Sequence, residues 1–410
     1  MRFVGATTGD PLFSNGIGLG VFIIVLVKAI VVFAFLLVSV MLMVWFERKV
    51  ISDMQNRIGP NRAGKWGLLQ TLADGIKLFF KEDLFPTRAD KMVFRLAPYL
   101  SAIPAFLAFS IVPIGGVVKV FGHTTELQLA DPPMGILFLL AISSISVYGV
   151  MLAGWSSGSK YPLLGAVRAS AQMISYEAAM GLTVAMVVLS TGSLSTRQIV
   201  NSQAGVIFGF LPNWNIFRLE FIPFFIFLIA VTAELNRPPF DLAEAEQELV
   251  GGFHTEYSSL RFALFFLAEF MNTVTMSAVI VTLFLGGPDG PDPAFLHWLW
   301  PIVWFGVKTL VFLFIYVWFR ATLPRLRYDQ LMELGWKVLI PLSLIFLLLL
   351  AGAMIGFTEG IAILVGAIVI VAVLYRAIQV GKSNPEHIVT SPSNKALVEL
   401  SQPTQETNNT

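Results

Sequence analysis

Long apolar runs recur along the whole chain, and each is close to the length that crosses a lipid bilayer. A helical span needs about 20 apolar residues, and runs of this kind begin near residue 17 and continue to residue 379. Backbone groups in lipid must pair within their own segment, so such runs fold as helices. The chain is 56% hydrophobic and only 13% charged, whereas a soluble domain carries roughly a quarter charged residues. We therefore predict an all-α polytopic membrane protein.

Hydropathy predicts nine transmembrane helices. Their approximate bounds are 17–46, 92–115, 134–154, 163–190, 218–236, 260–286, 300–320, 337–357 and 361–379. The fifth is the least regular, because its apolar stretch is short and ends at Glu234. These spans form a predicted membrane domain over residues 1–380. A polar segment over residues 381–410, rich in Ser, Pro, Asn, Gln and Thr, is predicted to be a disordered cytoplasmic tail.

The distribution of basic residues predicts the orientation of the spans. Of the 27 Lys and Arg residues, 20 fall in connections on one side and four on the other. Basic connections stay in the cytoplasm, so the N-terminus is predicted outside and the C-terminus inside. The net charge of +1 gives no field that favours nucleic acid. The absence of cysteine excludes disulfides, thiolate-held iron–sulfur clusters and Cys-type zinc sites in this chain.

The loop from Glu47 to Lys91 contains a predicted amphipathic interfacial helix. Apolar residues between Trp66 and Phe80 fall near helical spacing over about four turns, while Asp74 and Lys77 point elsewhere. One interpretation is a simple anchor at the membrane surface. The other is one wall of a cavity for an amphipathic, lipid-like molecule, because fixed charges beside an apolar face suit a polar head on an apolar tail.

Several charged residues lie inside predicted spans, where each costs at least about 2.5–3.5 kcal/mol if it faces lipid. Arg168 and Glu177 share one span, but their separation corresponds to about 900° of helical rotation, so they lie on nearly opposite faces and cannot pair with each other. Each therefore needs partners on other helices or in water. Lys28, Glu269 and Lys308 are further intramembrane ions. For Glu177 two interpretations stay open: a buried structural ion pair, or a proton carrier in an apolar setting.

The connection "VTAELNRPPFDLAEAEQELVGGFHTEYSS" gathers six carboxylates between two apolar runs. They are Glu234, Asp241, Glu244, Glu246, Glu248 and Glu256. Two prolines followed by Asp241 and Glu244 fit the capped start of a helix, which explains part of the charge. Crowded carboxylates cannot all ionise. The capped helix start does not explain Glu246, Glu248 and Glu256. Two interpretations of these acids remain open: a solvated surface loop, or a funnel that accepts protons.

Metal and nucleotide chemistry find no support in the sequence. The four histidines have no metal-ligand spacing, and the glycine-rich stretch at Gly16–Gly20 enters a span without a preceding strand. No metal site is predicted. The remaining chemistry is proton handling and binding, with electrons supplied by another chain.

Four blocks of the sequence, in order, resemble one known family. They are "ERKVISDMQNRIGPNRAGKWGLLQTLADGIKLFFKED", "GAVRASAQMISYEAAMGL", "AELNRPPFDLAEAEQELVGGFHTEYSSLRFALFFLAEF" and "RATLPRLRYDQLMELGWK". The family is the quinone-chamber membrane subunit, known as the H subunit, of proton-pumping NADH:quinone oxidoreductase (respiratory complex I). The likeness covers about residues 17–357. Mitochondrial members end after eight spans, so nothing functional is transferred to the ninth span and the tail.

The resemblance implies a non-redox subunit of a proton-translocating enzyme in the bacterial cell (inner) membrane, with quinone, either ubiquinone or menaquinone, as substrate. The chain itself would hold no cofactor, because the iron–sulfur clusters and FMN reside in partner subunits. Implied partners are the peripheral subunit with the terminal cluster and the small and antiporter-like membrane subunits. Implied quinone-site residues are Glu47, Arg48, Asp74, Lys77, Arg237, Asp241, Arg320 and Arg325. Implied proton-relay residues are Glu177, Glu234, Glu244, Glu246, Glu248, Glu256 and Glu269.

Two other functions compete with this one. The same fold serves as a subunit of membrane-bound hydrogenases or formate-driven complexes, which do not use quinone. A stand-alone secondary transporter is the third possibility, but such proteins often have inverted repeats and paired broken helices, and the sequence has neither.

Overall fold

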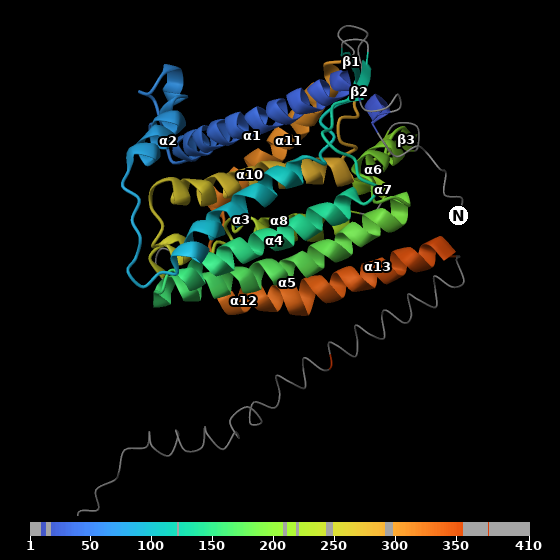
Figure 1. Cartoon of the computed structure of the whole chain (residues 1–410). Helices are drawn as coiled ribbons and strands as arrows, with labels where there is room; N and C mark the ends of the chain where they lie inside the picture. The colour runs from blue at the N-terminus through green and yellow to red at the C-terminus, as the bar shows by residue number, and fades with distance from the viewer. Residues whose placement is uncertain are drawn as a thin grey trace, which may run out of the picture. The chain divides into compact units, whose positions relative to one another are not determined.

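The computed structural model describes residues 10–13, 18–120, 123–207, 211–218, 221–242, 249–291, 298–355 and 376 (Figure 1). Its contacts divide the chain into two units, residues 1–347 and 348–410. The cavities and the charged residues that line them all lie in the first unit. Within the described residues, seven helices are long and apolar enough to cross a membrane. The all-α polytopic class is confirmed.

The long helices are separated by short turns and small helices. The α-helices are α1 Leu19–Met54, α2 Gln70–Phe80, α3 Lys91–Phe109, α4 Gly135–Ser156, α5 Lys160–Thr191, α6 Thr196–Ser202, α7 Asn215–Arg218, α8 Ile222–Glu234, α10 Ser259–Phe284, α11 Trp300–Thr322, α12 Tyr328–Glu333 and α13 Ile340–Ile355. The short 3-10 helices are η1 Pro11–Phe13, η2 Lys65–Gly67 and η3 Gly252–His254, and η4 Leu334–Leu339 is a π-helix.

The bundle is built around α10, most of whose side chains are buried, whereas most of α1 faces outward. α3 packs on both α4 and α10, α5 packs on α4 and α8, and α1 packs on α10 and α11. One core cluster joins Val44, Ala105, Met271 and Val317, each from a different helix. Figure 1 shows α1, α3, α4, α5 and α10 running side by side.

Close helix contacts require small residues at the crossing points. A Cβ atom at Gly149 of α4 would lie 2.2 Å from Ser101 Oγ and 2.8 Å from Ser101 N on α3. No side chain fits in that space, so glycine lets the two backbones approach. The start of α3 is fixed by Asp90, whose carboxylate accepts hydrogen bonds from the backbone amides of Met92 and Val93.

Two antiparallel hairpins lie at the opposite end of the bundle from α2 (Figure 1). β1 Val117–Val120 pairs with β2 His123–Glu126, and β3 Val206–Ile207 pairs with β4 Leu211–Pro212. In the first hairpin Val117 faces Glu126 and Val118 faces Thr125. These short strands were not predicted, because hydropathy reports only the membrane-crossing segments.

The predicted count of nine spans is not confirmed. The fifth predicted span corresponds to α8, whose 13 residues extend about 20 Å and are shorter than the hydrocarbon core of about 30 Å. Phe221, with a φ of 64°, and Pro223 limit its start. Asn236, with a φ of 51°, ends it. The predicted ninth span, 361–379, and the tail, 381–410, lie outside the described residues.

Three other predicted bounds differ from the structure. The first helix continues past residue 46 to Met54, because its charged last turns need not lie in lipid and contain no helix breaker. The interfacial helix is shorter than predicted and begins at Gln70, since Trp66 has a φ of 59°. The eighth span begins at Tyr328 rather than 337, through α12 and the π-helical segment that precedes α13.

Candidate functional site

Four of the predicted site residues meet in one charge cluster. Glu47 of α1 lies against the guanidinium of Arg320 from α11. Arg237, in the turn after α8, places Nη1 3.6 Å from Glu47 Oε2 and Nη2 3.2 Å from Glu269 Oε1 of α10. The Arg237 guanidinium also lies 4.5 Å from the ring centre of Phe270. Two acids and two bases from four elements therefore balance one another. Glu47 and Arg237 are buried, whereas Glu269 is half-buried and Arg320 is exposed, so the pairing lowers the cost of burying Glu47 and Arg237.

The other predicted quinone-site residues form two further groups of ion pairs. Arg48 Nη1 lies 2.8 Å from Asp74 Oδ2, which joins the end of α1 to α2, and Lys77 Nζ lies 3.7 Å from the second oxygen of Asp74. Asp241 pairs with Arg325 at 3.2 Å. The structure thus brings all eight residues to the same end of the bundle, in three separate ion-pair groups.

An apolar groove opens between α1, α2 and α10. Its volume is about 700 Å³. Its lining is almost entirely aliphatic and aromatic. The lining residues are Leu37, Val38, Val40, Met41, Val44, Arg48, Thr71, Leu72, Asp74, Gly75, Ile76, Leu78, Phe79, Tyr99, Leu260, Ala263, Leu264, Phe266 and Leu267. Only Arg48 and Asp74 bring charge, so the groove is an apolar site with an ion pair in its wall.

A charged cavity adjoins this apolar groove. Its volume is about 460 Å³. The lining residues are Val44, Glu47, Arg48, Ile51, Ser52, Arg57, Ile58, Gly59, Pro60, Phe266, Phe270 and Arg320. Val44, Arg48 and Phe266 line both spaces. A molecule that occupies both would therefore have apolar contacts at one end and several arginines with a carboxylate at the other.

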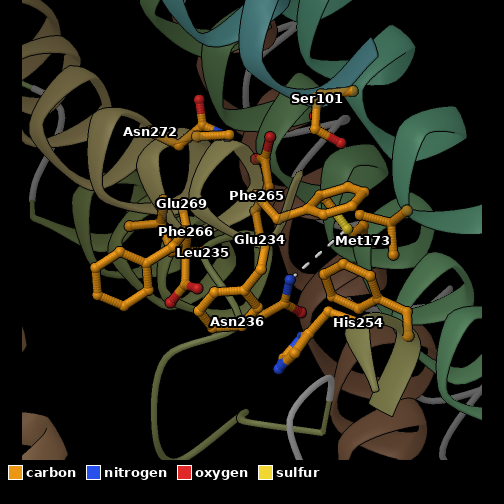
Figure 2. Close-up of a pocket in the computed structure, with 15 residues that line it drawn as sticks. Ser101, Met173, Glu234, Leu235, Asn236, His254, Phe265, Phe266, Glu269 and Asn272 are labelled. Atoms are coloured by element: carbon orange, nitrogen blue, oxygen red, sulfur yellow. Dashed lines mark hydrogen bonds between the residues drawn. The ribbon is translucent and has the colours of Figure 1, made fainter. Parts of the chain in front are cut away.

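A smaller inner cavity of about 70 Å³ lies between α3, α4, α5, α8 and α10. Phe266 lines it as well as the charged cavity. Figure 2 shows Ser101 and Asn272 at one end and Asn236 and His254 at the other, with Glu234 and Glu269 between them. Its polar lining and its size allow one or two ordered waters. Glu234, Leu235 and Asn272 also line a further space of about 20 Å³ beside Ser143.

The two acids farthest along this series are held by adjacent serines of α4. Ser143 donates a hydrogen bond to Glu234 Oε1, and Ser144 donates one to Glu177 Oε1. Because the serines are consecutive, the carboxylates of Glu177 from α5 and Glu234 from α8 contact neighbouring positions of α4. Glu234 is buried, whereas Glu177 is half-buried.

The remaining intramembrane ions have partners of their own. Arg168, on the other face of α5 from Glu177, lies 5.4 Å from the ring centre of Tyr328. Lys28 donates to Asp10 at 2.8 Å and to Thr125 at 2.9 Å. Lys308 donates to the carbonyl oxygens of Leu285, Gly287 and Asp289 at the C-terminal end of α10. The predicted separation of Arg168 from Glu177 is confirmed.

The acidic connection is only partly visible. Glu244, Glu246 and Glu248 lie outside the described residues, so their predicted role stays a prediction. Glu256 is half-buried between η3 and α10 and lines none of the four spaces described above. Within the described residues, no group of three or more His, Cys, Asp or Glu is arranged to hold a metal ion.

Several residues of the site carried no recognisable signal in the sequence. His254 lines the inner cavity between the rings of Phe253 and Phe262. Burial lowers the pKa of its imidazole to about 4, although Asp241 acts in the opposite direction. Burial likewise raises the pKa of Tyr257 to about 12. Ser143, Ser144 and Gln172 are ordinary helix residues in the sequence, and only the packing of α4 and α5 reveals their contacts.

Comparisons with known proteins place the chain in one family. A family described as NADH dehydrogenase matches residues 27–351. The chain is 51% identical to the H subunit of NADH-quinone oxidoreductase from Frankia alni over 379 residues, which are 89% of this chain and 82% of that protein. It is 52% identical to the protein of the same name from Frankia casuarinae over 366 residues, 86% and 80% of the two chains. The corresponding Streptomyces avermitilis protein is 52% identical over 337 residues, 80% and 72% of the two.

Proposed function

We propose a function from the premise that this chain belongs to the NADH dehydrogenase family and is related to the H subunit of NADH-quinone oxidoreductase. The chain forms the chamber in which quinone is bound, and it couples quinone reduction to proton movement. The chain is a membrane subunit of that enzyme complex and associates with its other subunits. The connected spaces and the buried charges of the bundle support the finer assignment.

The series of connected spaces is the observation that carries the proposal. The apolar groove, the charged cavity and the inner cavity share lining residues in turn, from the outer surface of α1 and α2 to Glu234. A quinone is a polar ring on a long apolar tail. The groove suits the tail, since binding there removes apolar surface from water and lipid headgroups. The charged cavity suits the ring, because Arg48, Arg57 and Arg320 offer hydrogen-bond donors to its carbonyl oxygens.

Reduction of a quinone to the neutral quinol takes two electrons, which the partner subunit with the terminal cluster would supply, and two protons. The ring at the charged cavity carries negative charge until the protons arrive. The added negative charge acts on Arg237 and Arg320, which are already shared with Glu47 and Glu269. A change in one member of a buried charge cluster alters the protonation of the others. Glu269 and Glu234 line the same inner cavity, and Glu234 and Glu177 are held by consecutive serines. We therefore propose the order Glu269, Glu234, Glu177 for the proton path.

Other parts of the assignment follow from family membership and the proposed site. We propose that the open cytoplasmic side of the chamber is covered by the peripheral subunit with the terminal iron–sulfur cluster. Protons would leave past Glu177 toward small and antiporter-like membrane subunits. The acids that would supply protons to this path from the chamber side are Glu244, Glu246, Glu248 and Glu256. The substrate is ubiquinone or menaquinone, in a bacterial cell membrane. The names of the relatives favour this function over the hydrogenase and formate alternatives.

Substitution of Glu177 by glutamine tests the proton path. The amide keeps the size of the side chain and accepts the hydrogen bond from Ser144, but it cannot carry a proton. We expect the complex to assemble and its coupled turnover to fall by about tenfold or more, the effect of removing a proton-transfer group. The measurement is NADH-driven proton uptake into inverted membrane vesicles, with the amount of complex read from a native gel.

Glu82→Gln is the matched control, because Glu82 is an exposed acid in the loop after α2. The control should pump normally. Normal pumping by Glu177→Gln would contradict the relay role of Glu177. A quinone-site inhibitor that fails to block turnover would contradict the quinone chamber and revive the hydrogenase-like alternative.

A further inference from the structure

Gln172 of α5 is fully buried and contacts both ends of the turn that follows α8. Its side-chain nitrogen donates to Ala233 O at 2.7 Å and to Phe240 O at 2.8 Å. It also lies 3.2 Å from Asn236 Oδ1. The turn from Ala233 to Phe240 therefore closes on a single amide group that belongs to another helix.

The orientation of this amide follows from its partners. Ala233 O and Phe240 O are backbone carbonyls, which accept hydrogen bonds and never donate them. The NH₂ group must face them, and its two hydrogens match the two carbonyls. Asn236 is tied to α5 as well, because its Nδ2 lies 3.8 Å from Met173 Sδ (Figure 2). The turn is thus fixed to two consecutive residues of α5.

The turn that Gln172 closes carries two groups of the proposed chamber. Glu234 points from it to Ser143, and Arg237 points from it to Glu47 and Glu269. Backbone bonds within the turn are few: Asn236 N donates to Ala233 O and Phe240 N donates to Arg237 O. Outside these residues, Arg237 N donates to Thr232 O at 3.3 Å and Pro239 O accepts from Leu326 N at 3.0 Å. Gln172 adds the contact that ties both ends of the turn to α5, so the direction of Arg237 depends on it together with these bonds and its ion pairs.

We propose that Gln172 is a positioning residue for quinone turnover, which holds the 233–240 turn so that Arg237 stays paired with Glu47, a lining residue of the charged cavity, and Glu234 faces the inner cavity. It does not touch the substrate itself. Because Gln172 and Glu177 lie on the same helix, the clamp also fixes the distance from the chamber to the exit of the proposed proton path. The inference rests on the proposed function, since it assigns Arg237 and Glu234 their roles.

Three substitutions in the whole complex separate positioning from stability. Gln172→Leu keeps the approximate volume and removes both donors. Gln172→Asn keeps the amide on a side chain that is one methylene shorter. Gln172→Glu puts a carboxylate against two carbonyl oxygens. Only the protonated carboxyl group can donate a hydrogen bond there, and it can donate to only one of the two carbonyls. All are assayed as assembled complex, for the quinone KM, kcat and the ratio of protons moved to NADH oxidised.

The matched control is Gln203→Leu at the opposite end of the bundle. Gln203 is equally buried, and its side-chain nitrogen donates to Ile199 O and Thr282 O at 3.2 and 2.9 Å. Loss of this amide should reduce thermal stability or the amount of complex and leave the quinone KM unchanged. We expect Gln172→Leu to raise the KM about fivefold or more per assembled complex. Gln172→Asn should be intermediate.

The glutamate variant gives a signature that a structural role would not produce. Relative to the natural protein, turnover of Gln172→Glu should rise as the pH falls from 8 to 6, whereas that of Gln172→Leu should not change. An unchanged KM and proton ratio in assembled Gln172→Leu would overturn the proposal. So would a loss of complex equal to that of Gln203→Leu with normal kinetics in the remainder. If Glu177→Gln pumps normally while the Gln172 variants change the quinone KM, the relay fails and the positioning role stands.

Discussion

His254 ties the stability of the chain to pH. Its imidazole closes one end of the inner cavity, and burial lowers its pKa to about 4, against 6.5 for an exposed histidine. Between these values the unfolded chain binds a proton that the folded chain does not. The free energy of unfolding is therefore constant above pH 6.5 and falls as the pH drops toward 4. Between pH 7.5 and 5.0 we expect a loss of about 1–2 kcal/mol, allowing for partial exposure.

His254→Asn isolates this contribution from every other titrating group. Asparagine keeps polar atoms at the cavity and does not titrate. Melting temperatures of the natural protein and the variant are measured in detergent at pH 7.5 and 5.0. The value for the natural protein minus that for the variant should be smaller at pH 5.0. A difference that is independent of pH would show that the histidine is not held in its neutral form.

The sequence predicts which side chains need partners but not what those partners are. Glu47, Arg237 and Glu269 are charged residues in an apolar chain, so their burial in a cluster follows from the cost of an unpaired ion. Gln172 and Ser143 give no such signal, because neutral polar residues are common in helices. Their partners come from a helix and a turn that lie far away in sequence, and only the packing of α4, α5 and α8 brings them together.

The arrangement of α1, α2 and α10 predicts how tail length affects substrate binding. Gly75 of α2 lines the apolar groove, and a Cβ placed there meets no atom within 4 Å. Gly75→Leu should therefore narrow the groove without displacing the helix. We expect the KM for a long-tailed quinone to rise about threefold to tenfold, and that for a short-tailed quinone to stay unchanged. The assay is NADH oxidation with the two quinones, which differ only in the tail.

Gly306→Leu is the control for this substitution. Gly306 is exposed on α11, and a Cβ there also meets no atom within 4 Å. It lines none of the spaces described above, so its substitution should affect neither quinone. Equal effects of Gly75→Leu on both quinones would mean that the tail does not lie in the groove.

Helices were predicted best where hydropathy alone determines them. Spans near 92–115, 134–154, 163–190, 260–286 and 300–320 correspond to α3, α4, α5, α10 and α11 with modest differences at the ends. The short α8 was overestimated, because a left-handed residue at each end limits the helix and hydropathy does not report φ. For the 47–91 loop the amphipathic pattern left two interpretations open, a surface anchor and a cavity wall. The structure places α2 beside an apolar groove, and the contribution of α10 to that groove depends on packing.

The two ends of the bundle differ in charge and in structure. α2, the last turns of α1 with Arg48, and the connections that carry Arg237 and Arg325 lie at one end (Figure 1). The hairpins, α6 and α7, with Lys119, Arg197 and Arg218, lie at the other. The fold of the chain alone thus places these two sets of connections at opposite ends of the bundle. From the excess of basic residues at the α2 end, we predict that this end faces the cytoplasm.

Cysteine labelling checks this orientation without background from the chain, which has no cysteine of its own. Asn61→Cys lies in the loop before α2, and Asn201→Cys lies in α6; both positions are exposed. A maleimide that does not cross membranes should label Asn201→Cys in right-side-out vesicles. It should label Asn61→Cys only in inverted vesicles from which the peripheral proteins have been stripped. The opposite pattern would place the acidic connection outside the cell, where NADH-derived electrons do not reach it, and would contradict the proposed coupling as well as the orientation.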